Sequence, residues 1–132
     1  MKARSRILCE SSLGCALSAI EIYNKPEFRL REQVFSVLMV IAWESLLKAK
    51  ILADNRNRLS SIQVPDGKGR YKKNRSGENL TISIKDALDR CGLSPVVREN
   101  IEALVRIRDA AVHLTKPSPN LPYLVFSLGA AT

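Results

Sequence analysis

Residues 99–113 read ENIEALVRIRDAAVH, and this stretch decides how the chain is expected to fold. At about 100° per residue, the turn of an α-helix, its apolar residues gather within roughly 60° of Ile101. Such a stripe is typical of a helix that packs one face against a hydrophobic core. We therefore predict a helix that begins at Pro95, after the capping residue Ser94, and ends near Thr115.

Arg108 lies on this apolar stripe, where a charged side chain is out of place. An arginine keeps its proton, so its burial is unfavourable unless it is paired or lies at the edge of a groove. On the same helical count Asp109 is about 80° and His113 about 120° from Ile101, with Arg106 beside the histidine. Such departures from a local rule tend to mark functional sites, so Arg108, Asp109 and His113 are candidate functional residues.

Length and composition favour one all-α domain, 1–132. The 132 residues can build a substantial core, and an apolar content of 45% with only 5% aromatic residues suits helices better than a β-sandwich. We expect an up-and-down bundle of about five helices. The other four are predicted at residues 4–23, 29–53, 83–91 and 123–131. No internal repeat is visible.

Two of these helices carry more specific expectations. The first is predicted to bury Leu13, Leu17 and Ile20, with a second apolar set at Leu8, Cys15 and Ile22. The second is apolar almost all round over residues 34–43, so it should be central, with Trp43 in the core. Glu44 follows that segment and needs a cationic partner, for which Arg108 is the obvious candidate.

The net charge of +8 makes an acidic polymer, RNA or DNA, the leading class of partner, ahead of a membrane surface. No apolar run is long enough to span a membrane, and the first residues lack the layout of a signal peptide, so we expect a cytoplasmic protein. Three cysteines without a Cys-x-x-Cys pair and a single histidine offer no structural zinc site. No metal or other cofactor is expected.

Residues 55–77 form a basic insert between the second and third predicted helices. The insert holds seven basic residues and one acid, Asp66, so it supplies +6 of the net +8. Turn residues at 65–69 allow residues 62–64 and 70–72 to pair as a short hairpin, although a solvated loop is the alternative. Cations that follow phosphates and an aromatic ring that stacks on a base would bind RNA. The candidate RNA-binding residues are Arg70, Tyr71, Lys72, Lys73, Arg75 and, from the later helix, Arg106.

An arginine and a histidine without metal ligands suit metal-independent cleavage of RNA. The ribose 2′-hydroxyl attacks its own phosphate when a base removes its proton and a cation stabilises the charge on the phosphoryl oxygens. Histidine titrates near neutral pH, and arginine presents a fork of donors to phosphate. Because the chain has one histidine, a two-fold dimer would be needed to supply both an acid and a base.

Residues 108–113, RDAAVH, resemble the motif of the HEPN superfamily, in which an arginine, a polar residue and three spacers precede a histidine. Arg106 also falls within the spacing that this family permits. With the segments 42–49, AWESLLKA, and 71–74, YKKN, the chain resembles an uncharacterised branch of bacterial HEPN-like defence proteins over most of residues 10–115.

The resemblance implies a helical bundle that dimerises through the motif helices and cleaves RNA without metal, in a prokaryotic defence, phage-defence or toxin–antitoxin system. By that analogy Arg108 and His113 are catalytic and Asp109 is auxiliary, with an antitoxin or an effector domain as a further partner. Some members of the family only bind RNA or nucleotides, so fold alone does not decide activity.

Two alternatives stay open at the level of sequence. The first is a non-catalytic nucleic-acid-binding module of a defence protein that continues beyond Thr132, since the apolar last segment ends abruptly. The second is a dimerisation bundle in which Arg108 forms an ion pair with Glu44 or Asp109 and His113 has no role.

Overall fold

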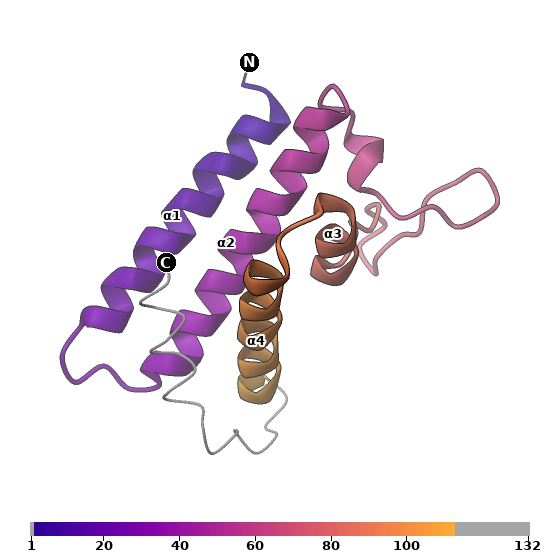
Figure 1. Cartoon of the computed structure of the whole chain (residues 1–132). Coiled ribbons are helices and arrows are strands. Elements are labelled where there is room, and N and C mark those ends of the chain that lie inside the picture. Colours follow the sequence, from indigo (N-terminus) through magenta and orange to yellow (C-terminus); the bar gives the residue numbers. More distant parts are fainter. Residues whose placement is uncertain (1, 113–132) are drawn as a thin grey trace. The chain divides into compact units, whose positions relative to one another are not determined.

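The computed structural model describes residues 2–112, which form an all-α structure. The elements are α1 (Arg4–Asn24), α2 (Arg31–Asp54), the short 3-10 helix η1 (Leu59–Ile62), α3 (Ile84–Cys91) and α4 (Pro95–Val112) (Figure 1). The predicted first four helices are confirmed to within about two residues at each described end. The predicted last helix, residues 123–131, and His113 lie outside the described residues.

The chain divides into two compact units, and each of the long helices α1 and α2 contributes to both. One unit consists of Met1–Glu10 and Glu44–Gly92, and we call it the insert unit because it contains the basic insert. The other consists of Ser11–Trp43 and Leu93–Thr132, and we call it the α4 unit.

In the α4 unit, α1 and α2 lie side by side and antiparallel. The Ser12 hydroxyl donates a hydrogen bond of 2.6 Å to the Ala42 carbonyl, and the rings of Tyr23 and Phe35 lie 5.1 Å apart. These two contacts pair early α1 with late α2 and late α1 with early α2, which is the order that antiparallel helices require. The connection between the helices is short, as the turn signal around Pro26 predicts.

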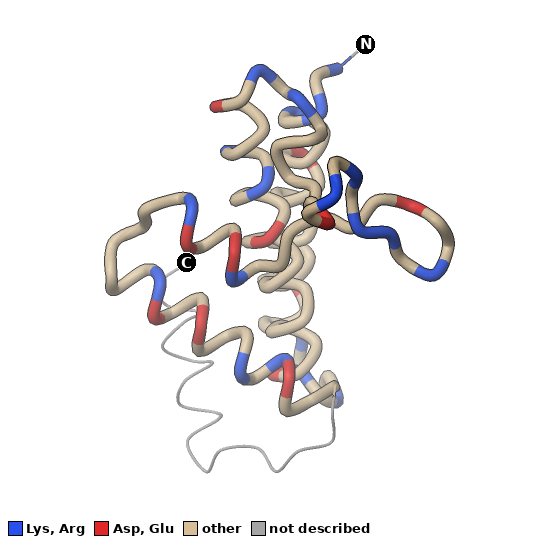
Figure 2. Tube along the Cα trace, turned by 90° about the vertical axis from the view of Figure 1, so that its right-hand side faces the viewer, with Lys and Arg blue, Asp and Glu red and all other residues tan. Residues whose placement is uncertain are grey.

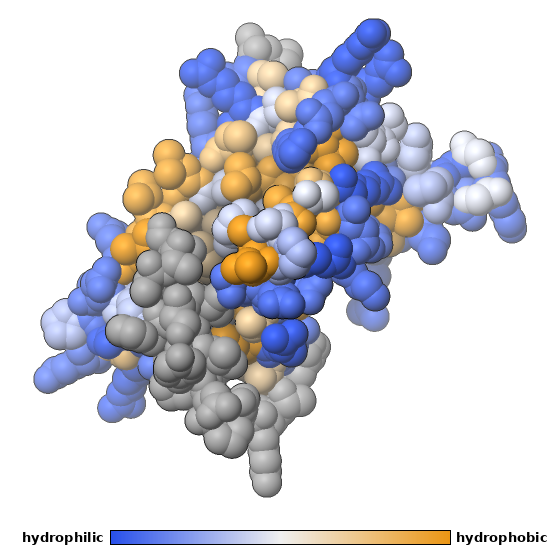
Figure 3. Space-filling model, in the orientation of Figure 1, coloured by the Kyte–Doolittle hydropathy of each residue, from blue (hydrophilic) through white to orange (hydrophobic). Residues whose placement is uncertain are grey.

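The buried side of α1 differs from the prediction. Leu13 and Leu17 are 61% and 56% exposed, whereas the small residues Ser12 and Ala19 are buried, so the predicted burial of Leu13 and Leu17 is wrong. Hydrophobic surface is accordingly visible along α1 in Figure 3. Small side chains let two helix backbones approach closely, and the large residues Phe35, Met39 and Val40 of α2 then fill the core. Ile20 is exposed too, while Leu8, Cys15 and Ile22 of the second set are half-buried.

Helix α2 contributes buried residues to both units. They are Phe35, Met39, Val40 and Ala42 in the α4 unit and Leu47, Ala49, Ile51 and Leu52 in the insert unit. Within residues 34–43 Ile41 is 42% exposed, so the expected covering of this segment on nearly every side is only partly met. Trp43 is only half-buried, contrary to the prediction that it lies in the core. Its smaller neighbour Ala42 is buried instead.

In the insert unit, α3 begins and ends as its sequence predicts. The Ser83 hydroxyl accepts a hydrogen bond of 3.2 Å from the backbone N–H of Asp86, which is the N-cap arrangement. Gly92 ends the helix in the left-handed conformation with φ of 60°. These local signals depend only on residues within a few positions of each other, so they can be read without tertiary information.

Outside η1 and α3, the insert unit contains three extended segments, around Val64, Lys72 and Leu80, that are joined into a closed ring by backbone hydrogen bonds. The N–H of Lys72 donates to the carbonyl of Val64 (2.8 Å), that of Leu80 to Lys72 (2.7 Å) and that of Val64 to Leu80 (3.0 Å). The predicted pairing of residues 62–64 with 70–72 is therefore confirmed, with the segment around Leu80 as an additional partner. Because each of these three residues both donates and accepts, the ring leaves none of these backbone groups unpaired at an edge.

The ring also contains an eight-residue structural repeat that the sequence analysis did not find. The Asp66 carboxylate accepts hydrogen bonds from the N–H groups of Lys68 and Arg70, and the Asn74 side chain accepts them in the same way from Ser76 and Glu78. Glycines with positive φ follow three residues after each, at Gly69 and Gly77. The two copies of the repeat share almost no identical residues, and Asp in one copy makes the same turn as Asn in the other. The repeat therefore cannot be recognised in the sequence.

Candidate functional site

Arg108 lies at the edge of the buried face of α4. The buried residues of this helix are Ile101, Ala103, Leu104 and Ile107, whereas Val112 is 59% exposed. The core-facing side is therefore rotated by roughly a quarter turn from the predicted stripe, towards Ile107. This rotation explains how an arginine is accommodated, because its side chain reaches solvent instead of the core.

The guanidinium of Arg108 is held by the carboxylate of the next residue. Its Nε and Nη2 atoms both donate to Asp109 Oδ1, at 3.1 and 2.8 Å, and the two side chains are 30% and 47% exposed. An arginine has more N–H donors than these two, so the pair can still present donors to a phosphate oxygen. Arg106 is exposed on the same helix.

The predicted pairing of Arg108 with Glu44 joins residues of different units and stays a prediction. Within the insert unit, Glu44 forms an ion pair of 3.9 Å with Lys48, one helical turn away. The Lys48 ammonium also donates to the hydroxyl of Thr81 (2.9 Å), which connects α2 to the end of the ring.

The basic side chains of the insert differ in what they contact. Arg70, Lys72, Lys73 and Arg75 are all exposed, on a segment that extends away from α2 and α3 (Figures 1 and 2). Lys73 is turned back onto its own turn, where its ammonium lies 3.4 Å from the Gly77 carbonyl. Exposed cations on a projecting segment can follow the phosphates of a nucleic acid, because each phosphate that they neutralise releases condensed counterions.

Tyr71 is half-buried and does not project with its basic neighbours. It lines an open pocket of about 530 Å³ together with residues from α2, η1 and α3. A second pocket of about 390 Å³ adjoins it, and the two share Asp54, Asn55, Ser60 and Ser61. The two pockets form one polar groove, which we call the η1 groove.

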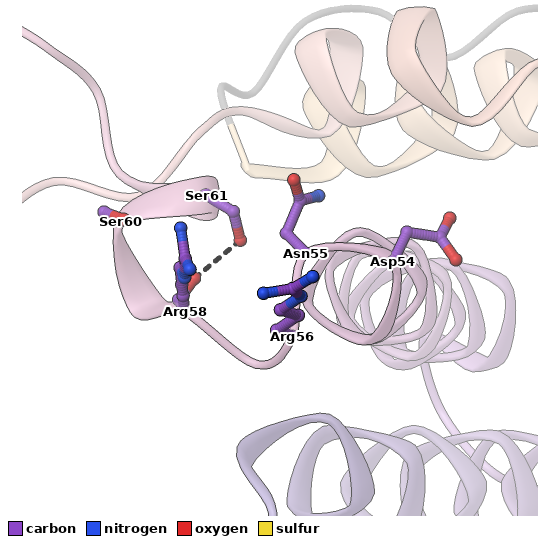
Figure 4. A pocket seen from close by; sticks show the side chains of 6 residues that line it. All are labelled: Asp54, Asn55, Arg56, Arg58, Ser60 and Ser61. Atoms are coloured by element: carbon purple, nitrogen blue, oxygen red, sulfur yellow. Dashed lines mark hydrogen bonds between the residues drawn. The ribbon is translucent and has the colours of Figure 1, made fainter.

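Two arginines from the turn after α2 line the η1 groove. Figure 4 shows Arg56 at the end of α2 and Arg58 beside Ser61, whose hydroxyl donates to the Arg58 carbonyl (2.7 Å). The carboxylate of Asp54 points away from both arginines and pairs with Lys50 at 2.9 Å. This hydrogen bond, with the charge of Asp54, raises the pKa of Lys50.

Sequence reasoning missed the residues that shape this groove. In the sequence, Arg56 and Arg58 contribute only to the net charge of the insert. Nothing in it distinguishes Asn55, Ser60, Ser61 and Arg90 as candidate site residues. The available signal was the Asn55–Asn57 run directly after a helix, because asparagine tolerates the left-handed backbone that such turns use.

Among the described residues, no cluster of three or more His, Cys, Asp or Glu side chains could hold a metal ion. Within the same part of the chain, no helix is long and apolar enough to cross a membrane.

The fold and these residues define an all-α chain with a basic insert. Residues 7–132 match the family described as a domain of unknown function, DUF3644, so the chain belongs to that family. Neither the curated proteins nor the solved structures contain a match to this chain.

Proposed function

We propose that this chain is a metal-independent endoribonuclease of a prokaryotic defence or toxin-type system, active as a homodimer. The observation that carries the proposal is the Arg108–Asp109 pair, which is half-exposed near the end of α4 and five residues before the only histidine of the chain. The resemblance of residues 108–113 to the HEPN motif supports the same assignment. RNA is the proposed substrate, and an antitoxin or effector domain is a further proposed partner.

In the proposed reaction, His113 removes the proton from a ribose 2′-hydroxyl, and the resulting oxygen attacks the adjacent phosphorus. The bond to the 5′-oxygen breaks, this oxygen takes up a proton from the histidine of the second copy, and a 2′,3′-cyclic phosphate remains. Arg108 stabilises the charge that develops on the phosphoryl oxygens, and Asp109 holds its guanidinium in place. The exposed cations of the insert bind the rest of the RNA strand.

The test is cleavage of mixed single-stranded RNA by the purified chain in a buffer with EDTA. We expect the wild type to produce cyclic phosphate ends, and Arg108→Ala and His113→Ala to lose at least about a hundredfold in rate. Arg98→Ala is the matched control, because Arg98 lies on the same helix, is 33% exposed and forms an ion pair with Glu102. Cleavage that persists in both site variants, or that fails equally in the control, would contradict the proposal.

A second candidate function is non-catalytic binding of nucleic acid. The closed ring favours it, because backbone hydrogen bonds within the ring hold a strongly basic segment in an ordered form. This candidate predicts RNA binding that depends on the insert and no turnover by the wild type under any of the conditions above.

A further inference from the structure

The η1 groove has one end suited to phosphate. Arg56, Arg58, Ser60 and Ser61 line it there, and Asp54, its acid, is already paired with Lys50. Guanidinium groups and hydroxyls are the donors that proteins use most for phosphate oxygens. The charge of this end is therefore positive even though the groove lies at the carboxyl end of α2.

The other end of the groove is less polar. Tyr71, Pro65 and Ile51 line it, beside Gln63 and Arg90. Tyr71 is half-buried and pairs with Pro65 in an antiparallel bridge, and an aromatic ring that lines a pocket offers a surface on which a nucleobase can stack. The guanidinium of Arg90 donates to the Ser61 carbonyl at 2.9 Å. This hydrogen bond connects α3 to η1 and fixes the two ends of the groove relative to each other.

The turn that carries the two arginines is held in an unfavourable backbone conformation. Arg56 and Asn57 have φ of 55° and 58°, a region that costs roughly 1–2 kcal/mol for a residue such as arginine. The N–H of Asn57 donates to the Leu52 carbonyl (2.7 Å), and its side chain accepts a 2.8 Å hydrogen bond from the N–H of Ser5. Strain of this kind is typical of sites whose residues are positioned for binding.

We propose that the η1 groove binds one nucleotide, with its phosphate against Arg56 and Arg58 and its base against Tyr71. Both pockets fall within the range of about 300–1,000 Å³ that is usual for small ligands. The nucleotide is either free or part of a single strand, since both present the same phosphate and base. The groove belongs to the insert unit, so this assignment does not require cleavage by residues of α4.

The test measures binding of two probes to the full chain by isothermal titration calorimetry: adenosine 5′-monophosphate and a hexadeoxyuridylate. Neither probe can be cleaved by attack of a 2′-hydroxyl within a strand, so a failure of the proposed ribonuclease activity leaves the result unaffected. We expect Arg56→Asn with Arg58→Gln to weaken binding at least about tenfold, because two charge-assisted hydrogen bonds are lost. Asparagine at position 56 keeps the left-handed backbone.

Substitutions of Tyr71 test the end of the groove that is proposed to bind the base. Tyr71→Leu is expected to weaken binding of the nucleotide about fivefold or more and to leave binding of inorganic phosphate unchanged, whereas Tyr71→Phe retains the ring and the affinity. Lys25→Ala with Arg29→Ala is the matched control, because it removes the same charge from the exposed loop between α1 and α2. We expect the control to change affinity less than about twofold.

Binding of the monophosphate identifies a free nucleotide as a sufficient ligand, and binding of the hexamer alone identifies a nucleotide within a strand. The proposal is overturned if the wild type binds neither probe. It is equally overturned if the control loses as much affinity as the groove variant, or if Tyr71→Leu, folded by circular dichroism, binds nucleotide as the wild type does.

Discussion

Asn57 shows how one residue supports a site that it does not line. Its side chain accepts the hydrogen bond of the Ser5 N–H, near the start of α1, in the way that an N-cap residue does, although it lies 52 positions away in the chain. Its backbone carbonyl also accepts a bond of 3.3 Å from the Arg4 guanidinium. The turn that presents Arg56 and Arg58 is thereby attached to α1.

We predict that Asn57→Ala lowers the free energy of unfolding by about 2 kcal/mol, since it removes the cap of α1 and replaces asparagine with a residue that tolerates the left-handed region less well. Asn57→Gly should cost only about 1 kcal/mol, because glycine keeps that backbone and loses the cap alone. Urea unfolding followed by circular dichroism measures both. Equal losses for the two variants would show that backbone conformation contributes nothing at this position.

Cys91, the last residue of α3, titrates differently from an exposed thiol. Burial, aided by the charge of Asp54 and opposed by that of Lys50, raises the pKa of the Cys91 thiol. Its thiol donates a hydrogen bond of 3.7 Å to the Leu47 carbonyl. The folded chain therefore retains this proton at a pH where the unfolded chain has released it.

Stability should consequently fall as pH rises from the usual thiol pKa through the higher pKa of the folded state, because the folded chain binds more protons in that window. We predict that the free energy of unfolding decreases as pH rises above about 8 for the Cys9→Ser, Cys15→Ser variant, which retains only Cys91. The decrease should be smaller when Cys91→Ala is added. Parallel curves for the two proteins would contradict the assignment.

At the scale of elements, α1 shows that an apolar stripe does not by itself identify a buried face. The helix carries two apolar faces, and α2 packs against the one that is lined with small residues. Shape decides between them, because close approach of two backbones gains more contact than the burial of a few leucines.

We predict that Ala19→Leu lowers the free energy of unfolding by about 1–3 kcal/mol, because Ala19 is fully buried and a larger side chain in a packed core forces its neighbours to shift. Leu17→Ala, two positions earlier and mostly exposed, should cost less than about 1 kcal/mol. Denaturant unfolding of the pair measures the contrast. A larger cost for Leu17→Ala would mean that the exposed stripe is covered in solution.

For the whole molecule, the distribution of charge matters more than its total. Most of the net charge of +8 belongs to residues 55–77, and the ring holds its cations on an extended segment. Affinity for a nucleic acid should therefore depend on the place from which charge is removed.

We predict that changing Lys72, Lys73 and Arg75 to Gln reduces the slope of log K against log salt by up to about 2 for a single-stranded oligonucleotide, since each lost phosphate contact accounts for about 0.7. The reduction is expected to fall below that limit because Lys73 already contacts its own turn. Changing Lys25, Arg29 and Lys85 to Gln provides the control with equal loss of charge. Equal slopes for the two triple variants would show that the insert is not the binding surface.

The candidate site was only partly predictable from the chain. Arg108 was identified because it interrupts an apolar stripe, and its partner Asp109 was among the alternatives. The η1 groove was not found, since Ser60 and Arg90 are far apart in sequence and neither breaks a local rule. Their proximity depends on where the ring and α3 return to the end of α2.

Sequence alone is enough to predict the all-α class, the described helix ends to within a residue or two, and the caps at Ser83, Gly92 and Ser94, because these depend on interactions among near neighbours. Tertiary packing selects which face of α1 is buried and how far α4 is rotated about its own axis, and it brings Asn57 to the start of a helix far away in the chain. Those outcomes depend on the shapes of partners that are distant in sequence, and packing energy between such partners is not encoded in any short stretch of residues.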